Sequence, residues 1–440
     1  MLPPLFFTVR LPTLLAIFWR THFDSRRIVG TSRKEPLSFI IFRLDSLGDV
    51  VMTTPLFQAL KKARPGSRCT VVVQQGYKSL LVTDPHIDEV LTLPRIGPAW
   101  LPQGIARLLS AVAFYWTRLR KRHFDFAISP RWDLDEHLAT FLCSLTHASS
   151  RIGYSDSSTP KKQRLNRGFD RAFSVCLQSR SVKHEVLRNL AIAELLGGTS
   201  SGAKPEVYLT ERDRRTADKL LARVGMSGKL IALGIGAQSP GRRWPLKRYA
   251  ATVSQLEKEN DVQTVIVCSA DERIEAKKLA RQLRRPPMML CGAPLREVCA
   301  VLERCDLFIG NDSGCAHLAA AVDCRTIVIS RHPREGAAKH FNSPLRFAPY
   351  CAHSRVLQPA TGLDECREAC SVTQPHCITR VSVEEVAAAS REMLKTARRV
   401  TGSPQIAMDQ RAQRLLQAHS ADAVKRALDA LRAGPPVVSV

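Results

Sequence analysis

Three short polar turns carry residues that could act chemically on a charged substrate: Asp45-Ser-Leu-Gly-Asp49, Arg242-Arg-Trp-Pro245 and Asn311-Asp-Ser-Gly-Cys-Ala-His317. A carboxylate such as Asp49 can take a proton from a hydroxyl group. Paired guanidinium groups match the charge and the geometry of phosphate. The third turn opens a helix, whose free N–H groups attract anions. Together the turns predict a polar site that can hold an anionic group such as a phosphate.

Each turn also has a purely structural interpretation. Asp49 stands just before an apolar helix and can cap it, as Asp312 and Ser313 can cap the helix of the third turn. His317 lies in the first turn of that helix and points back toward the same spot. The Arg242 and Arg243 loop can be a solvent-exposed basic loop. The residues alone leave both interpretations open.

Alternating strands and helices are expected to position these turns, since each turn follows an apolar strand and enters a helix. In α/β sheets, ligands bind at the carboxyl ends of the strands. The expected strands are 37–44, 69–73, 89–93, 125–129, 230–235, 262–268 and 306–309. The expected helices are 50–63, 105–119, 133–145, 185–196, 211–224, 247–257, 272–284, 295–304, 315–322 and 383–398. Such alternation predicts parallel sheets.

Small and polar residues at 197–205 indicate a linker between two α/β halves. We therefore expect one domain over 37–204, a second over 205–385 and a cleft between them. Residues 1–36 are predicted to be an N-terminal extension, either on a membrane surface or disordered. Residues 386–440 are predicted to form a C-terminal helix and a basic tail.

The composition predicts an acidic partner in a reducing compartment. Among 440 residues, Lys and Arg number 65 against 40 Asp and Glu, a formal charge of +25. Nucleic acid is not expected, because the basic segments lack aromatic stacking platforms and known reader motifs. The 13 cysteines, an odd number spread through apparent core elements, favour the cytoplasm.

Two segments bear on membrane contact. Residues 11–19 are apolar but too short to span a bilayer, and prolines interrupt the segment around them. The helix at 105–119 has an apolar face and ends in the basic run 118–122, which fits either a membrane-surface helix or ordinary packing against the sheet.

A cysteine cluster near the C-terminus offers either a metal site or packed or paired thiols. Its spacing is not a standard zinc pattern. The cluster consists of Cys351, Cys366, Cys370 and Cys377, with His353 and His376 nearby.

In their order and spacing the three turns resemble those of glycosyltransferase family 9, the lipopolysaccharide heptosyltransferases, over about residues 37–385. The resemblance implies an α/β GT-B fold, with two Rossmann-like, doubly wound parallel-sheet domains facing across a cleft. The first domain would bind an acidic glycolipid acceptor and the second a nucleotide sugar. The activity implied is inverting transfer of a heptose or similar sugar from an ADP-activated donor to lipopolysaccharide inner core or a related glycan, on the inner face of the cytoplasmic membrane.

The resemblance also implies roles for individual residues. Asp49 would be the general base, and no metal or other cofactor is expected. The implied acceptor-binding residues are Arg43 and Arg131. The implied residues for the nucleotide sugar are Arg243, Gln238, Asp312, Ser313, Gly314 and His317, with Asp271 or Glu272 on the ribose.

Other features point elsewhere. Asp133-Leu-Asp135 resembles the metal-binding Asp-x-Asp motif of the other large glycosyltransferase fold, although helix capping explains it better. Cys315 replaces a residue that is often Pro or Leu in the family. Two alternatives therefore remain: a transferase of the same fold that uses another nucleotide sugar, and a non-catalytic α/β protein that binds anions or nucleic acid.

Overall fold

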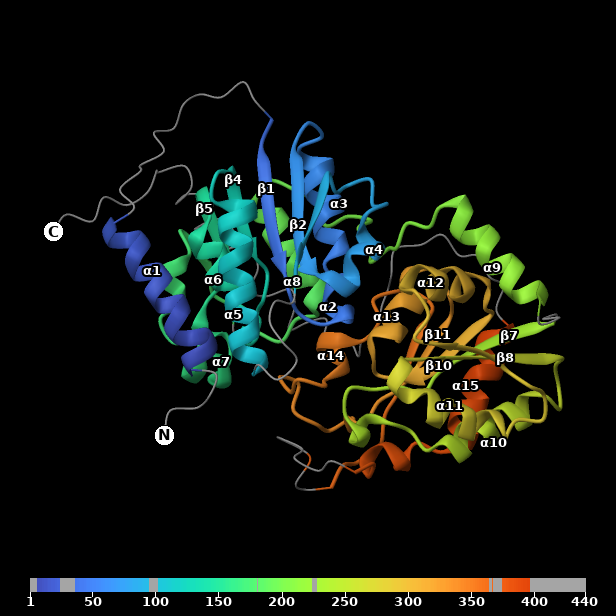
Figure 1. The fold of residues 1–440 in the computed structure, drawn as a ribbon. Coiled ribbons are helices and arrows are strands. Elements are labelled where there is room, and N and C mark those ends of the chain that lie inside the picture. The colour runs from blue at the N-terminus through green and yellow to red at the C-terminus, as the bar shows by residue number, and fades with distance from the viewer. Residues whose placement is uncertain are drawn as a thin grey trace. The chain divides into compact units, whose positions relative to one another are not determined.

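The computed structural model describes residues 6–23, 36–94, 102–179, 181–223, 228–363, 366 and 374–395. These form two compact units (Figure 1). The first contains the described residues up to Ser181 and Glu185–Ala203, and the second contains Val182–His184 and the described residues from Lys204 onward. The chain thus leaves the first unit inside the segment that the sequence marks as a linker.

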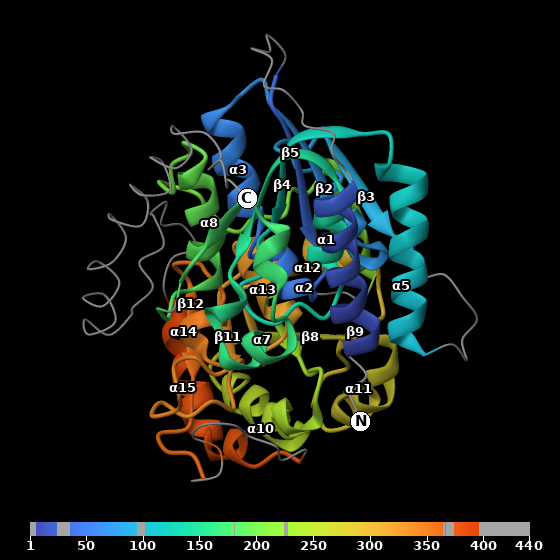
Figure 2. The same ribbon diagram turned by 90° about the vertical axis from the view of Figure 1, so that its left-hand side faces the viewer.

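The first unit is built on a six-stranded parallel sheet in the order β3-β2-β1-β4-β5-β6. Its strands are β1 (Ser38–Arg43), β2 (Arg68–Gln74), β3 (Glu89–Leu93), β4 (His123–Ser129), β5 (His147–Tyr154) and β6 (Val175–Leu177). Its α-helices are α1 (Leu11–Phe23), α2 (Leu47–Val51), α3 (Thr54–Ala63), α4 (Lys78–Leu81), α5 (Gln103–Phe114), α6 (Ala139–Leu145), α7 (Pro160–Leu165) and α8 (Glu185–Leu195). Figure 2 shows α1 and α5 on the side of this unit that is turned to the viewer.

The second unit repeats the plan, with strand order β12-β11-β10-β7-β8-β9, all parallel. Its strands are β7 (Lys229–Gly234), β8 (Val262–Cys268), β9 (Met288–Cys291), β10 (Leu307–Asn311), β11 (Thr326–Ile329) and β12 (Ser354–Leu357). Its α-helices are α9 (Glu211–Arg223), α10 (Leu246–Leu256), α11 (Arg273–Ala280), α12 (Leu295–Arg304), α13 (Gly314–Ala321), α14 (Pro344–Phe347) and α15 (Val383–Lys395).

Both strand orders are the doubly wound Rossmann order, in which the winding reverses between the first and fourth strands of each half. The central strands are apolar on both faces, as a sheet covered by helices on both sides requires; Ile40, Ile41 and Phe42 are fully buried. The predicted pair of Rossmann-like parallel-sheet domains is confirmed. That the two face each other across a cleft stays a prediction.

Two predicted boundaries do not match the packing. Residues 1–36 were predicted to be an extension, but α1 packs on α6, and Val9 and Ala16 lie in the hydrophobic core of the first unit. Likewise α15 crosses the predicted boundary at 385/386, and it packs on α10 as part of the second core. In both places an amphipathic helix buries its apolar face on the neighbouring domain instead of standing apart.

Several elements differ from their expected lengths. The expected helix 50–63 is two helices, α2 and α3, with Pro55 in the first turn of the second. The expected helix 133–145 begins only at Ala139. Strands β5, β6, β9, β11 and β12 were not predicted; four of them are three or four residues long, too short for a periodic pattern to identify.

Candidate functional site

Asp49 lies at the switch point of the first sheet, in the short helix α2 that follows β1. One carboxylate oxygen, Oδ2, accepts hydrogen bonds from Ser46 Oγ at 2.6 Å and from Ser46 N at 3.3 Å. This reciprocal contact closes a capping box at the start of α2. The capping interpretation of Asp49 is therefore correct for this oxygen, and it leaves the other oxygen for further contacts.

The second oxygen, Oδ1, faces two guanidinium groups. Arg131 Nη1 lies at 3.4 Å and Arg43 Nη2 at 3.9 Å. Burial would by itself raise the pKa of Asp49, which is 7% exposed, but the charges of Arg131 and Arg43 and the Ser46 hydrogen bonds outweigh it and hold the pKa below the usual 3.8. Asp49 is thus a carboxylate at neutral pH, with a fixed orientation.

Asp45 is a second buried carboxylate at this point that was not predicted as a site residue. Its Oδ2 pairs with Arg43 Nη1 at 3.1 Å, and its Oδ1 lies 3.6 Å from Arg131 Nε and 3.8 Å from His137 Nδ1. Two carboxylates and two guanidinium groups therefore alternate in one cluster. Ionic groups at this depth are stable only when paired in this way.

Arg43 was predicted to contact the acceptor, and the structure places it against the two carboxylates. Its side chain is 1% exposed and turned toward Asp45 and Asp49. Arg43 follows the buried residues of a central strand, so its side chain lies below the surface that a ligand reaches. We therefore assign Arg43 to positioning the carboxylates, whereas the Arg131 side chain is partly exposed beside them.

A buried lysine supports the segment that carries Arg131. Lys162 Nζ donates to the carbonyl oxygens of Arg131, Trp132 and Tyr154 at 2.8–3.3 Å. Burial lowers its pKa to about 8. The Lys161–Arg164 run is therefore not a uniformly exposed basic patch. Asp135 of the Asp-x-Asp sequence is also structural, because its carboxylate accepts hydrogen bonds from the backbone N–H groups of His137, Ala139 and Thr140 at the start of α6.

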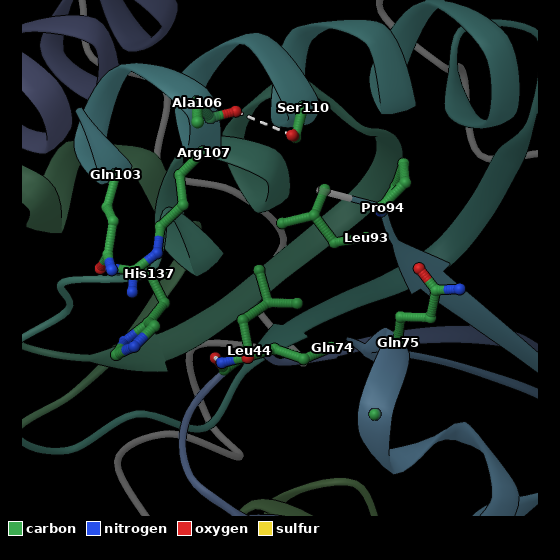
Figure 3. Close-up of a pocket in the computed structure, with 11 residues that line it drawn as sticks. Leu44, Gln74, Gln75, Leu93, Pro94, Gln103, Ala106, Arg107, Ser110 and His137 are labelled. Carbon is green, nitrogen blue, oxygen red and sulfur yellow. Dashed lines mark hydrogen bonds between the residues drawn. The ribbon is translucent and has the colours of Figure 1, made fainter. Parts of the chain in front are cut away.

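A pocket of about 360 Å³ adjoins the charged cluster within the first unit (Figure 3). Figure 3 shows Gln103, Arg107 and Ser110 on one wall, contributed by α5, and Leu44 and Gln74 opposite. The lining residues are Leu44, Gln74, Gln75, Gly76, Leu93, Pro94, Gln103, Ala106, Arg107, Ser110 and His137. His137 joins the two features, because it lines the pocket and lies beside Asp45.

The polar residues of this pocket were missed from the sequence. The apolar face and basic end of the helix at 105–119 predicted membrane contact or packing on the sheet, and not a pocket wall. A Gln-x3-Arg-x2-Ser pattern, which places Gln103, Arg107 and Ser110 on one side of α5, was the available signal. Polar side chains on one face of an otherwise apolar helix next to a sheet indicate a lined cavity.

In the second unit, the turn after β10 is tied to the loop after β7 by Asn311. Its amide nitrogen donates to Ile235 O at 2.7 Å, and its Oδ1 accepts from Trp244 N at 2.8 Å and Tyr249 Oη at 3.0 Å. These are the two loops of the switch point, since β7 and β10 are the strands where the order reverses. Asn311 is therefore a structural link between the loops that carry the predicted residues.

The two arginines of the β7 loop have separate partners. Arg242 Nη2 donates to the Asp312 backbone oxygen at 2.6 Å and to its Oδ2 at 2.7 Å. Arg243, the residue predicted to face phosphate, donates to Ala237 O and lies 3.0 Å from Glu272 Oε1. Arg243 and Glu272, both predicted for the nucleotide sugar, are thus brought together, with Arg242 as an additional residue that fixes Asp312.

Ser313 precedes α13 with extended backbone angles, yet no side-chain cap hydrogen bond is present. Its Oγ is buried, and no hydrogen-bond partner for it is found among the described residues. The helix begins at Gly314, and His317 is buried in its first turn. Capping therefore does not account for Ser313. Its hydroxyl group and the first N–H groups of α13 are suited to an anionic ligand.

Of the remaining predicted residues, Asp271 and Glu272 follow β8, and Gln238 lies in the loop after β7. Glu272 is buried and closes a capping box with Ser269, whereas Asp271 and Gln238 are exposed. A Cβ atom at Gly236 would lie 2.1 Å from Glu272 Oε2. A larger residue at this position would displace the Glu272 carboxylate, because the loop passes directly over it.

One group among the described residues has metal-ligand chemistry: Cys366, His376 and Cys377 in the second unit. Cys351 and His353 do not belong to it, and Cys370 lies outside the described residues.

Comparison with known proteins identifies heptosyltransferases among the relatives of this chain. The family model described as glycosyltransferase family 9 (heptosyltransferase) matches residues 112–346. A lipopolysaccharide core heptosyltransferase of Haemophilus influenzae, OpsX, is 24% identical over 321 residues, covering 72% of this chain and 82% of its own.

Solved structures agree on the fold. A family 9 glycosyltransferase from Veillonella parvula superposes with a TM-score of 0.66 at 21% identity, over 82% of this chain and 97% of its own. Escherichia coli heptosyltransferase WaaC, solved with ADP, gives a TM-score of 0.57 at 18% identity, over 81% of this chain and 100% of its own.

Proposed function

The chain belongs to glycosyltransferase family 9, the heptosyltransferases, and from this premise we propose that it transfers a heptose from an ADP-activated donor to lipopolysaccharide inner core or a related acidic glycan. The observation that carries the proposal is the Asp49 carboxylate, held ionised at the end of a central strand and joined through Asp45 and His137 to a polar pocket. This is the arrangement that a hydroxyl acceptor and its general base need.

The proposed reaction is a single displacement. Asp49 takes the proton of the acceptor hydroxyl as its oxygen forms a bond to the anomeric carbon, and the bond from that carbon to the diphosphate breaks with its electron pair on the leaving ADP. Attack from the face opposite the nucleotide inverts the anomeric configuration. Its low pKa makes Asp49 a modest base but keeps it unprotonated at working pH, which suits proton transfer late in the displacement.

On the nucleotide side, the turn from Asp312 to His317 and the loop with Arg242 and Arg243 would hold the diphosphate. Negative charge grows on the leaving group, so the guanidinium groups, Ser313 Oγ and the N-terminus of α13 would stabilise it. We expect no metal in this step. Adding Mg²⁺ or Mn²⁺ to a metal-free assay should leave the rate unchanged, and a strict requirement for either ion would contradict this expectation.

The acceptor proposal rests on the charge around the pocket. Arg107 contributes a guanidinium group to the pocket wall, and Arg131 lies partly exposed beside the carboxylate cluster. Inner-core glycans carry carboxylate and phosphate groups, which these side chains can pair with. The wider excess of basic residues, +25 over the whole chain, would attract such an acceptor to the protein.

We also propose that the protein works at the inner face of the cytoplasmic membrane. α5 packs against the segment Phe6–Arg10 that leads into α1. Both helices expose large apolar side chains: Leu15, Phe18 and Trp19 on α1, and Ile105, Leu109, Val112 and Trp116 on α5 and the turn after it. Exposed Arg118, Arg120 and Lys121 follow directly. Apolar side chains bordered by basic residues suit an anionic lipid surface.

No helix within the described residues is both long enough and apolar enough to cross a bilayer. The proposed attachment is therefore through these surface side chains. The full-length protein should sediment with vesicles that contain anionic phospholipid and not with neutral ones. Trp19→Asp combined with Trp116→Asp should release it, whereas Thr117→Asp, an exposed change that removes no apolar contact, should affect sedimentation much less. Equal binding of both variants would contradict the proposed surface.

The central experiment offers the protein a panel of nucleotide sugars, first without an acceptor and then with inner-core lipopolysaccharide from heptose-deficient cells. A ligand that binds only the native state raises its melting temperature. We expect ADP-heptose to give the largest shift and a heptose mass increment on the acceptor. A larger shift and transfer with a different nucleotide sugar would identify the alternative donor. No response to any member of the panel would overturn the proposal.

A further inference from the structure

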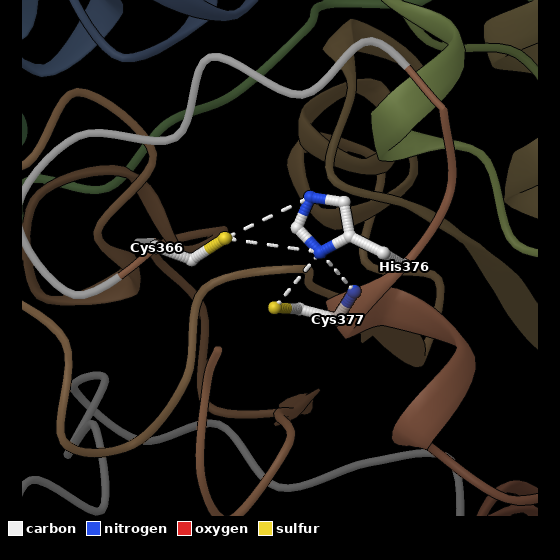
Figure 4. Close-up of side chains that lie close together, drawn as sticks. All are labelled: Cys366, His376 and Cys377. Atoms are coloured by element: carbon white, nitrogen blue, oxygen red, sulfur yellow. Dashed lines mark hydrogen bonds between the residues drawn. The ribbon is translucent and has the colours of Figure 1, made fainter. Parts of the chain in front are cut away.

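Cys366, His376 and Cys377 bring two sulfur atoms and one imidazole together in the second unit (Figure 4). Figure 4 shows the sulfur atoms of Cys366 and Cys377 both facing the His376 ring. His376 Nδ1 lies 3.0 Å from Cys377 Sγ, and both ring nitrogens lie 3.8 Å from Cys366 Sγ. One potential ligand atom from each residue lies within 4.8 Å of the other two.

These separations fit a metal ion. Tetrahedral zinc with bonds of about 2.3 Å to sulfur and about 2.0 Å to nitrogen places its ligand atoms roughly 3.5–3.8 Å apart. The 3.8 Å from the ring nitrogens to Cys366 Sγ lies at the upper end of that range, and the 3.0 Å from Nδ1 to Cys377 Sγ lies below it. Side-chain adjustments of less than about 1 Å would therefore give the separations of a tetrahedral site. Thiolate with imidazole is also a ligand set preferred by zinc over calcium or magnesium.

A small cavity of about 10 Å³ lies against the cluster. Arg331, His332, Pro333 and His340 complete its wall, and they come from the segment that follows β11. A space of this size is about that of one water molecule or one ion. The cluster is therefore next to a space that can take an ion and is too small for an organic ligand.

The position of the three residues suggests what an ion would do there. Cys366 follows β12, and Cys377 begins the turn Cys377–Arg380 that leads into α15. That turn is anchored in the core: Ile378 and Val381 are fully buried, and Trp244 Nε1 donates to Val381 O at 3.0 Å. An ion bound by both cysteines would fasten the chain after β12 to this anchored turn.

The same ion would also border the proposed nucleotide-sugar site. The cavity wall from Arg331 to His340 continues from the carboxyl end of β11, and Asp312 N donates to Ile329 O, the last residue of that strand. Trp244, which holds the anchored turn, follows Arg243 in the β7 loop. The cluster thus packs behind the loops after β7 and β10, which carry the residues predicted for the nucleotide sugar.

We propose that Cys366, His376 and Cys377 form a structural zinc site that joins the end of β12, the segment after β11 and the start of α15. The site takes no part in sugar transfer. It stabilises the carboxyl end of the second sheet, as structural metal sites do when their ligands come from segments that would otherwise be held weakly.

The test measures metal in the full-length protein, purified without a histidine tag in the presence of reductant. We expect about one zinc per chain in the wild type by elemental analysis, and a loss of most of it in Cys366→Ser, Cys377→Ser and His376→Gln. The matched control is Cys351→Ser. Cys351 is also a buried thiol of the second unit, but it does not belong to the cluster. It should keep its zinc.

A second measurement begins with the metal-free wild type, whose result does not depend on how well any variant folds. Cobalt added to metal-free wild type should give the thiolate-to-cobalt charge-transfer absorption, and Cys377→Ser should give a weaker one with one thiolate fewer. Zinc should raise the melting temperature of the wild type and of Cys351→Ser but not of Cys377→Ser. Wild type that contains no zinc and shows no charge-transfer absorption with cobalt would overturn the proposal, as would equal zinc loss from Cys351→Ser.

Discussion

The two switch points of this protein share a topology and differ in chemistry. In the first unit, the ends of β1 and β4 carry a buried cluster of alternating charges around Asp49. In the second, the ends of β7 and β10 carry glycine-containing loops, the Arg242–Asp312 pair and the start of α13. The same strand order therefore positions a buried, ionised carboxylate in one unit and guanidinium and helix N–H groups in the other.

The difference shows which parts of a doubly wound domain are free to vary. Strand order and core packing determine where the loops lie. The few residues after each strand determine what each loop binds. In the first unit, the buried charged groups fix the orientation of one carboxylate. The second keeps N–H groups and a hydroxyl group available instead. The following predictions test this division of roles.

The largest effect is expected from Asp49→Asn. An amide cannot take the acceptor proton, so the transfer rate should fall about 10³-fold, within the usual contribution of a general base. Thermal stabilisation by the nucleotide sugar should stay as in the wild type, because that ligand is assigned to the second unit. Asp88→Asn, which alters a half-exposed ion pair with Lys61 in the same unit, should transfer at nearly the wild-type rate. Near wild-type transfer by Asp49→Asn would show that Asp49 is not the base.

Arg243→Gln should give the opposite pattern. Losing a charged hydrogen-bond donor at the diphosphate should raise the KM for the nucleotide sugar about 10- to 100-fold, with a smaller change in the KM for the acceptor. Steady-state kinetics with each substrate varied in turn would measure both. Arg285→Gln removes an exposed pair with Asp261 and serves as the control. If Arg243→Gln raises only the acceptor KM, the assignment of roles to the two units is wrong.

Arg131→Gln should change the pH dependence of transfer. Asp49 must be ionised to act, and its pKa is held below 3.8 by Arg131 and Arg43 against the opposing effect of burial. Without Arg131 the pKa rises, so kcat/KM should fall several-fold between pH 8 and pH 5, whereas the wild-type value stays level over that range. Arg107→Gln should weaken acceptor binding without producing this decline. Parallel profiles for wild type and Arg131→Gln would contradict the coupling of Arg131 to Asp49.

The smallest effect is expected from Lys162→Met, in stability. The pKa of Lys162 is about 8 when folded, below its value of 10.5 when exposed, so the cost of burying its charge is fully present below pH 8 and disappears as the pH rises toward 10.5. The stability of the wild type relative to Lys162→Met should therefore increase by about 1–2 kcal/mol between pH 7.5 and pH 9.5. Urea unfolding at the two pH values measures it, and a constant difference would mean that Lys162 is not perturbed.

Much of the fold was predictable from local sequence. Long apolar strands such as β8 and amphipathic helices such as α12 match their expected ranges, because their periodicity is set by the residues themselves. The short strands β9, β11 and β12 were not found. Four residues are too few to give a reliable period, and it is pairing with neighbouring strands that makes these segments strands.

The sequence by itself determined the family, the two parallel-sheet halves and the turns around Asp49, Arg243 and Asp312, since each depends on residues close together in the chain. Only the tertiary structure decided that Asp45 and Arg131 share a cluster with Asp49, that Arg43 is buried, and that α1 belongs to the first core. It also separated Cys366, His376 and Cys377 from Cys351. The physical reason is the same in each case. Burial and pairing of charged or thiol groups depend on segments that are distant in the sequence, and a local sequence pattern does not indicate which segments come into contact.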